Sequence, residues 1–288
     1  FNPEDFYAND EIVITISHLG YIKRTNLDEF RAQARGGVGS RGGTTRDSDF
    51  IEYIYPAMMH DTLLFFTACG RCYWLKAYEL PEGTKNAKGR AIQNMLNIEK
   101  DDAINACLYV KKLSDAEFCN SHYVVFCTKN GTIKKTSLSD YSRPRANGVI
   151  AINIREDDRV VSAVLTNGTD ELVIANRNGR AIRFNEDSVR VMGRTATGVR
   201  GITLDGEDDE VVGMVCVNNS EKETIMVVSE KGFGKKSPIE DYRKTNRGGK
   251  GVKTLQITEK TGKVAAIKSV TDDDDLMIIN KSGIVIRL

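Results

Sequence analysis

The sequence predicts an all-β, propeller-like fold of six repeats of about 50 residues, the sixth of which is truncated. Three observations support this prediction. A hairpin with a central glycine recurs along the chain, a second glycine follows it at a nearly constant distance, and segments with helical periodicity are almost absent. Because one hairpin cannot bury its own apolar face, the repeats must pack on one another. We therefore expect residues 1–288 to form a single domain.

Each repeat opens with a β-branched strand, a short turn containing glycine and a second strand that carries a basic residue. In two repeats the turn is Asn-Gly, which between alternating apolar runs is among the strongest short hairpin signals. The six hairpin glycines are Gly20, Gly70, Gly131, Gly179, Gly232 and Gly283. The sixth repeat stops at Leu288, before its later strands. Helix is expected only as a short turn over residues 113–118.

The second glycine of each repeat lies in a basic loop, 17 to 19 residues after the hairpin glycine. These loop glycines are Gly39, Gly89, Gly148, Gly198 and Gly251. Strands follow the loops, and acidic clusters such as Glu156–Asp158 come next. Basic and acidic residues thus occupy different phases of one repeat. Repetition about an axis predicts a basic band and a separate acidic zone, even though the formal net charge is only +1.

The first copy of this loop, residues 33–43, is the richest in glycine. Five of its eleven residues are glycine and two are arginine. Glycine lets the backbone approach a bulky group, consecutive main-chain N–H groups can form an anion site, and arginine matches phosphate oxygens. The stretch therefore predicts a loop that contacts a phosphate backbone. The alternative is a flexible surface loop.

A basic residue stands four positions after the hairpin glycine in five of the six repeats, and Trp74 takes this position in the second. Such residues can simply be solvated strand residues that protect sheet edges. Their recurrence in phase, beside the basic loops, favours a rim that follows a phosphate backbone. The predicted rim comprises Lys23, Arg24, Lys85, Lys88, Lys134, Lys135, Arg143, Arg145, Arg183, Arg194, Arg200, Lys235, Lys236, Arg243, Lys244, Arg247, Lys250 and Arg287.

The sequence shows no element that reads bases: no recognition helix, no zinc finger and no run of interleaved aromatic residues. Contacts with DNA would go to phosphates, which position a protein without reading sequence. A curved basic rim suits a bent duplex, whose bending over 20–30 bp costs about 1–6 kcal/mol. We therefore expect salt-dependent and weakly sequence-selective binding of double-stranded DNA.

The cysteines and histidines form no recognisable metal or catalytic pattern. Cys69 and Cys72 make one C-x-x-C without a second pair, and the three histidines are far apart. We expect reduced structural cysteines in a cytosolic protein; a redox or metal protein that uses Cys69 and Cys72 is the alternative. No apolar run approaches the ~20 residues of a membrane helix. Because the chain begins at Phe1, we expect it to be part of a longer protein.

At this level of detail the chain resembles a known family, the C-terminal domain of the DNA gyrase A subunit. The resemblance is carried by the repeat, the opening glycine loop, Met192–Arg200 and Asn246–Val252, and it covers essentially the whole chain. It implies a six-bladed β-pinwheel, which is a propeller relative that exchanges strands between blades and wraps DNA around its rim. It also implies that this domain is a non-catalytic part of a topoisomerase, because the tyrosine that attacks DNA lies in a preceding domain.

The resemblance implies partners and a binding box as well. The partners would be the rest of the dimeric gyrase A chain and gyrase B, in an A2B2 holoenzyme of the bacterial cytoplasm that introduces negative supercoils with ATP. The domain itself would be a monomer without a cofactor, since ATP and Mg are used elsewhere. The family's box reads Gln-Arg-Arg-Gly-Gly-basic-Gly, and here Ala34 and Val38 replace two of its charges. The implied DNA-binding box is Gln33, Arg35, Gly36, Gly37 and Gly39, with Arg41 as a substitute charge just downstream.

Two other assignments are open at this point. The related C-terminal domain of topoisomerase IV usually has a more eroded box and fewer blades. A propeller that serves as a protein-interaction module would be expected to carry Trp-Asp and Gly-His signatures, which this sequence lacks.

Overall fold

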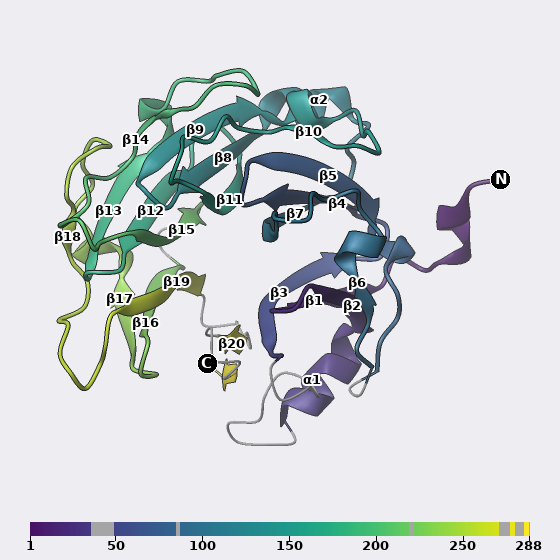
Figure 1. The fold of residues 1–288 in the computed structure, drawn as a ribbon, viewed down its shortest axis with the longest axis horizontal. Helices are drawn as coiled ribbons and strands as arrows, with labels where there is room; N and C mark the ends of the chain where they lie inside the picture. Colours follow the sequence, from purple (N-terminus) through teal and green to yellow (C-terminus); the bar gives the residue numbers. More distant parts are fainter. Residues whose placement is uncertain (36–48, 85–86, 219–221, 271–276, 280–284, 288) are drawn as a thin grey trace.

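The computed structural model describes the chain except for residues 36–48, 85–86, 219–221, 271–276, 280–284 and 288. Its antiparallel sheets follow one another in chain order along an arc about a central axis (Figure 1). Helices among the described residues are few and short. The prediction of an all-β, propeller-like arrangement of repeats is therefore confirmed.

Each of the first four blades has four strands, ordered from the axis outward as an inner strand, two hairpin strands and a two-residue outer strand. Blade 1 contains β3 (Ile51–Met58), β1 (Glu11–Ser17), β2 (Tyr21–Asn26) and β6 (Arg90–Ala91). Blade 2 contains β7 (Ile104–Val110), β4 (Thr62–Thr67), β5 (Arg71–Lys76) and β10 (Val149–Ile150). Blade 3 contains β11 (Val160–Thr166), β8 (Tyr123–Thr128), β9 (Thr132–Ser137) and β14 (Val199–Arg200). Blade 4 contains β15 (Val211–Val217), β12 (Glu171–Asn176), β13 (Arg180–Asn185) and β18 (Val252–Lys253).

The fifth blade has three described strands, which are β19 (Val264–Val270), β16 (Thr224–Ser229) and β17 (Gly234–Pro238). The sixth repeat shows only a two-stranded ladder, β20 (Met277–Ile279) with β21 (Val285–Arg287). The described residues thus form five blades, and the prediction of six is wrong. The reason is that a hairpin alone is not a blade: each of the five blades also has an inner strand beside its hairpin, and the described part of the sixth repeat shows no such strand.

The outer strand of each four-stranded blade comes from the basic loop of the next repeat. Tyr21 of β2 pairs with Ala91, and Ala181 of β13 pairs with Val252 of the following repeat. The loop glycine makes this approach possible. Gly251 has a φ of +76°, and a Cβ added there would lie 2.1 Å from the carbonyl oxygen of Ala181. A side chain at this position would therefore separate the exchanged strand from the blade that it completes.

The core lies between neighbouring blades, because each sheet packs its faces on the next. Between blades 2 and 3, for example, the Phe66 ring meets Phe126 edge-to-face at 4.9 Å, and Tyr141 packs on both. The inner strands β7, β11, β15 and β19 contact one another in succession around the axis. The outer strands, by contrast, lie at the perimeter of the arc (Figure 1).

One aspartate in each of three acidic clusters has a structural role that the sequence did not predict. Asp102, Asp158 and Asp209 each accept, at 3.0 Å, the main-chain N–H of the residue just before a hairpin glycine. Their neighbours, such as Glu156 and Asp208, stay exposed. One aspartate of each cluster therefore caps a hairpin turn, and most of the remaining carboxylates form exposed acidic groups at the turn end of the blades.

The helical segments connect the strands. The α-helices are α1 (Leu27–Arg35) and α2 (Ala116–Ser121), and the 3-10 helices are η1 (Pro3–Phe6), η2 (Ala77–Glu79), η3 (Ile92–Asn94), η4 (Leu138–Tyr141), η5 (Glu186–Ser188) and η6 (Ile239–Asp241). The turn of helix expected over residues 113–118 is α2, which begins at its N-cap Asp115. No helix was expected at α1, whose Asn26 side chain accepts the N–H of Asp28.

Candidate nucleic-acid interface

Of the basic residues four positions after the hairpin glycines, three do not lie on an exposed rim, whereas Lys236 is exposed. Arg24 and Lys135 are buried, and Arg183 is half-buried in an ion pair. Arg24 Nε donates to Leu80 O at 2.9 Å, and Arg183 Nη1 donates to Tyr242 O at 3.1 Å. Both acceptors belong to the following repeat, just before the loop that supplies the outer strand. The expectation that these three side chains lie on the surface is wrong, because they hold neighbouring repeats together.

Trp74 supports this structural explanation of the repeated position. It occupies the same place in the second repeat, and its Nε1 donates to Tyr141 O of the third repeat at 2.9 Å. A neutral indole makes the same bond as a guanidinium. In the first four repeats the position therefore holds a long hydrogen-bond donor to the next repeat, and phosphate binding does not explain its positive charge in three of them.

Lys135 and Arg183 are also neutralised by carboxylates. Lys135 Nζ lies 3.0 Å from Glu186 Oε1, and both side chains are almost completely inaccessible to solvent. Arg183 makes a bidentate pair with Glu171 at 2.6 and 3.0 Å. The hydrogen bonds from Arg183 lower the pKa of Glu171 below its usual range. Neither cation is available to a phosphate.

Lys23 and Lys134, one position earlier in the repeat, are buried as well. Lys23 Nζ donates to Thr84 O and Ala87 O at 3.0 and 2.9 Å. Lys134, which is 0% exposed, donates to Ala151 O at 2.5 Å and Arg194 O at 2.7 Å. Burial lowers the pKa of Lys23, and burial lowers the pKa of Lys134 to about 7. A neutral amine still has two N–H donors for the two carbonyl groups.

Lys134 is expected to make stability depend on pH. Its pKa falls from 10.5 in the unfolded chain to about 7 in the fold, so between these values the unfolded chain binds the extra proton. The free energy of unfolding should therefore rise with pH above 7, by up to about 1.4 kcal/mol per pH unit. The measurement is urea unfolding of the unchanged protein and of Lys134→Met from pH 6.5 to 8.5. The free energy of unfolding of Lys134→Met should lack this rise with pH.

Above pH 8.5 a second group of residues opposes this effect. Burial raises the pKa of the Cys72, Cys107, Cys127 and Cys216 thiols, so ionisation of these thiols in the unfolded chain lowers stability at high pH. Both the unchanged protein and Lys134→Met contain these thiols, so the difference between their pH profiles is free of the thiol contribution. Equal pH slopes for the two proteins would contradict the assignment to Lys134. All six cysteines are free thiols.

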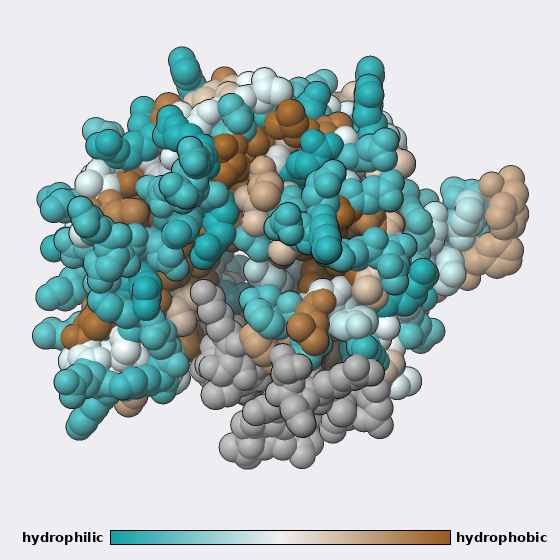
Figure 2. All heavy atoms as spheres, viewed as in Figure 1, coloured by the Kyte–Doolittle hydropathy of each residue, from teal (hydrophilic) through white to brown (hydrophobic). Residues whose placement is uncertain are grey.

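The exposed cations that remain lie mostly in the loops that supply the outer strands. Of the predicted rim, the exposed members are Lys88, Arg143, Arg145, Arg200, Lys235, Lys236, Arg243, Lys244 and Lys250, and Arg194 and Arg247 are half-buried. Arg90 of β6 and Lys253 of β18 are exposed too and were missed. They stand one and two residues after the loop glycines Gly89 and Gly251, so the same repeat phase could have identified them. Figure 2 shows hydrophilic side chains covering the perimeter on the side of β13 and β18.

The loop that completes blade 4 carries more exposed cations than the loop that completes blade 2. The loop that completes blade 2 contributes Arg143 and Arg145, whereas the loop that completes blade 4 contributes Arg243, Lys244, Lys250 and Lys253. These four side chains have no hydrogen-bond or ion-pair partner within the described part of the chain. Their charges are therefore free to meet an anion outside the protein.

The predicted binding box is described only in part. Gln33 and Arg35 end α1, so the box begins in helix and not in a loop. Gly36, Gly37, Gly39 and Arg41 lie outside the described residues, as does Lys85 of the predicted rim. Arg287 lies in β21, and its side chain is also outside the described part. The role of the box in DNA binding stays a prediction.

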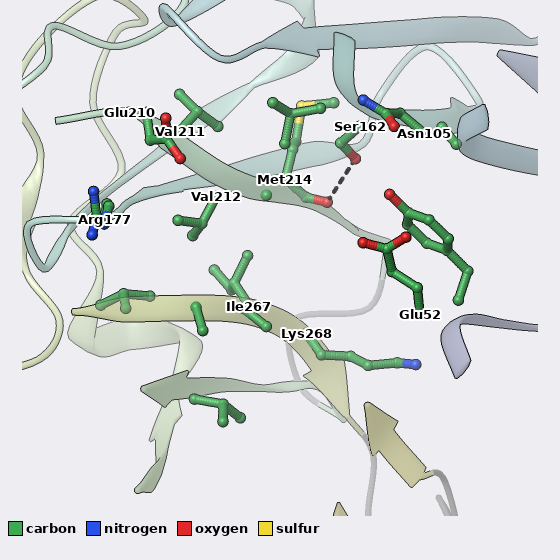
Figure 3. A pocket seen from close by; sticks show the side chains of 18 of the residues that line it. Glu52, Asn105, Ser162, Arg177, Glu210, Val211, Val212, Met214, Ile267 and Lys268 are labelled. Atoms are coloured by element: carbon green, nitrogen blue, oxygen red, sulfur yellow. Dashed lines mark hydrogen bonds between the residues drawn. The ribbon is translucent and has the colours of Figure 1, made fainter. Parts of the chain in front are cut away.

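A cavity of about 880 Å³ lies at the axis, against the inner strands (Figure 3). Its walls include Val161, Val212 and Ile267 from three successive blades. Charged residues at the cavity pair across blades: Arg159 lies 3.9 Å from Glu210, and Arg177 lies 3.4 Å from Glu230. The other charged residues of the lining are one acidic and one basic residue, Glu52 and Lys268. The cavity lining is therefore not a second positively charged surface.

The described residues contain no group of three or more histidine, cysteine or acidic side chains that could hold a metal ion. Within the same residues, no helix has the length and apolar character needed to cross a membrane.

Comparison with known proteins identifies the repeat. A family model described as DNA gyrase C-terminal domain, beta-propeller, matches residues 11–57, 61–111, 122–167, 170–218 and 223–271. These five segments correspond to the five blades. The DNA gyrase A subunit of Staphylococcus aureus (strain NCTC 8325 / PS 47) is 44% identical over 285 residues, which are 99% of this chain and 32% of that protein. The chain thus spans about a third of the length of the curated relatives it matches.

Two solved structures share the arrangement. A structure of a DNA gyrase A C-terminal domain is 26% identical, with a TM-score of 0.78, and the match covers 94% of this chain and 86% of that one. A C-terminal domain of DNA topoisomerase IV is 27% identical, with a TM-score of 0.72, and the match covers 98% of this chain and 84% of that one.

Proposed function

Because the chain belongs to the family of DNA gyrase C-terminal domains, we propose that it binds double-stranded DNA along its perimeter and wraps the duplex around the blades. Residues 1–288 would act as one non-catalytic domain that supports ATP-dependent negative supercoiling by the holoenzyme. The observation that carries the proposal is the placement of exposed cations on the loops that supply the outer strands.

The geometry suits a curved ligand with regularly spaced negative charge. The outer strands β6, β10, β14 and β18 repeat around the arc, and each brings its loop to the perimeter. A DNA duplex carries a charge every ~1.7 Å and releases counterions when lysine and arginine neutralise its phosphates. Several such contacts can offset the cost of bending, which is about 1–6 kcal/mol for 20–30 bp. Wrapping therefore requires only a continuous row of cations on a convex surface.

The partners that we propose follow from the relatives. They are the rest of a gyrase A chain, present as a dimer, and gyrase B in an A2B2 assembly of the bacterial cytoplasm. The domain would be a monomer by itself and would need no cofactor, since ATP and Mg serve other parts of the holoenzyme. We infer gyrase rather than topoisomerase IV because the curated relatives at 44% identity are gyrase proteins. The protein-interaction alternative has no observation in its favour.

The test is a DNA wrapping assay with a full-length gyrase A chain that contains this domain, assembled into the holoenzyme. A nicked circle is sealed with ligase in the absence of nucleotide, and the linking number of the product is measured over a salt series. We expect a shift in linking number that disappears as salt rises, because the contacts are to phosphates. An unchanged linking number at low salt, with the holoenzyme bound, would overturn the proposal.

A further inference from the structure

Two arginines of the perimeter are bound to a neighbouring loop. Arg194 Nη1 donates to Ile150 O at 2.9 Å, and Arg247 Nη1 donates to Arg200 O at the same distance. Arg247 Nε also donates to Ser188 O at 3.1 Å. Unlike the exposed cations of the same loops, these two arginines are half-buried.

The two bonds are copies of one arrangement. Arg194 and Arg247 each stand four residues before a loop glycine, Gly198 and Gly251. Their acceptors Ile150 and Arg200 each end an outer strand, two residues after the preceding loop glycine. Each arginine therefore ties the outer strand of one blade to the loop that completes the next blade, once between blades 2 and 3 and once between blades 3 and 4.

The junction before them is made differently. Pro144 occupies the equivalent position, four residues before Gly148, and has no donor. Asn97 Nδ2 donates instead to Ala146 O at 3.3 Å. A side chain thus bridges this junction too, but within the described residues a guanidinium of the loop itself does so at the next two junctions.

Main-chain bonds connect the same loops independently of the arginines. Gly248 N donates to Gly201 O at 2.7 Å, and Thr203 N donates to Gly249 O at 2.9 Å. Asn153 N donates to Ala196 O at 3.1 Å at the other junction. The loops therefore remain attached when an arginine is changed, and only the side-chain bonds are lost: Arg194 to Ile150 O, and Arg247 to Arg200 O and Ser188 O.

We propose that Arg194 and Arg247 are positioning residues that set the spacing and orientation of successive DNA-contacting loops, and so the curvature of the wrapped duplex. A planar guanidinium holds its acceptors in a fixed arrangement, one for Arg194 and two for Arg247, whereas a lysine ammonium on a flexible stem does not. Because DNA bending depends on where successive phosphates are held, small changes in loop orientation alter the wrap without removing a charge.

This inference rests on the proposed DNA wrapping and is tested with the charge-conserving variant Arg194→Lys/Arg247→Lys in the holoenzyme assembled from the full-length chain. We expect DNA affinity within about threefold of the unchanged protein and the same salt slope, since the number of cations is equal. The linking-number shift per bound holoenzyme should be clearly smaller. The matched control is Arg155→Lys, an exposed arginine outside the basic loops with no side-chain partner in the described residues, which should change neither quantity.

The outcomes separate the inference from the function on which it rests. If the unchanged protein does not wrap DNA, the proposed function fails. If it wraps and the double variant wraps equally well, the positioning role is wrong. If the double variant loses affinity or its thermal unfolding temperature drops, the arginines serve phosphate binding or general stability, and the positioning role is again wrong. The single variant Arg194→Lys provides the same test at one junction if the double variant does not fold.

Discussion

Replacing Glu186 with alanine is expected to lower the free energy of unfolding by about 3–5 kcal/mol, which is a large part of the stability of a typical domain. Glu186 is 0% exposed and its carboxylate receives four donors. Those donors are Lys135 Nζ at 3.0 Å, Thr166 Oγ1 at 2.8 Å, Asp170 N at 2.8 Å and Gly168 N at 3.2 Å. Alanine would leave a buried ammonium and two main-chain N–H groups without this acceptor.

Urea unfolding of the 288-residue chain measures the effect, and Asp187→Ala is the matched control. Asp187 is the next residue of the same 3-10 helix, but its side chain is exposed, so its loss should cost within about 0.5 kcal/mol. Replacing the pair, as Lys135→Met with Glu186→Leu, should recover part of the loss, because no charge is then left buried without a partner. A loss below about 1 kcal/mol for Glu186→Ala would contradict the role of the pair.

The second large effect is expected at the perimeter of blade 4. The variant with Arg243, Lys244, Lys250 and Lys253 all changed to glutamine removes four exposed cations without breaking a described contact. At about 0.9 per phosphate, the slope of log K against log salt should become shallower by about 3.6 if each cation neutralises one phosphate. The affinity for DNA at 0.1 M salt should fall by about three to four orders of magnitude, because the slope change of about 3.6 acts over one log unit of salt below 1 M. Stability should change little, because the side chains are exposed.

The control for this variant carries the same change in net charge. Lys100, Lys111, Lys112 and Lys260, all exposed and all outside the basic loops, are changed to glutamine together. Titration of a DNA duplex over a salt series compares the two variants. Similar losses of affinity would show that overall charge, and not the perimeter, attracts the DNA.

The periodicity of the sequence predicts most of the fold, because the hairpin and loop glycines mark positions that need a positive φ or a close backbone approach. Gly131 and Gly198 illustrate this, with φ values of +93° and +108°. The number of blades was overestimated for a different reason. The sixth hairpin has the same local signal as the others, but a blade also needs a third strand and an exchanged strand, which a local pattern cannot show.

The site was predicted less well. A cation that recurs in the repeat can be a buried hydrogen-bond donor or an exposed charge, and both give the same sequence pattern. Lys134 and Arg243 are both basic residues in phase with the repeat. One is fully buried between carbonyl groups, and the other is exposed on a loop. Trp74 at a position otherwise held by cations was the available sign that a hydrogen-bond donor, and not a charge, was needed there.

The sequence by itself therefore determined the repeat, its hairpins, its family and the presence of basic loops, because each depends on residue type and spacing along the chain. Only the tertiary structure decided which cations face solvent. That distinction arises from strand exchange, which brings the loop of one repeat over the second hairpin strand of the previous repeat and buries Lys23, Arg24, Lys134 and Lys135 beneath it. The burial of a side chain depends on what lies above it in space, and that neighbour is some 50 to 60 residues away in the chain.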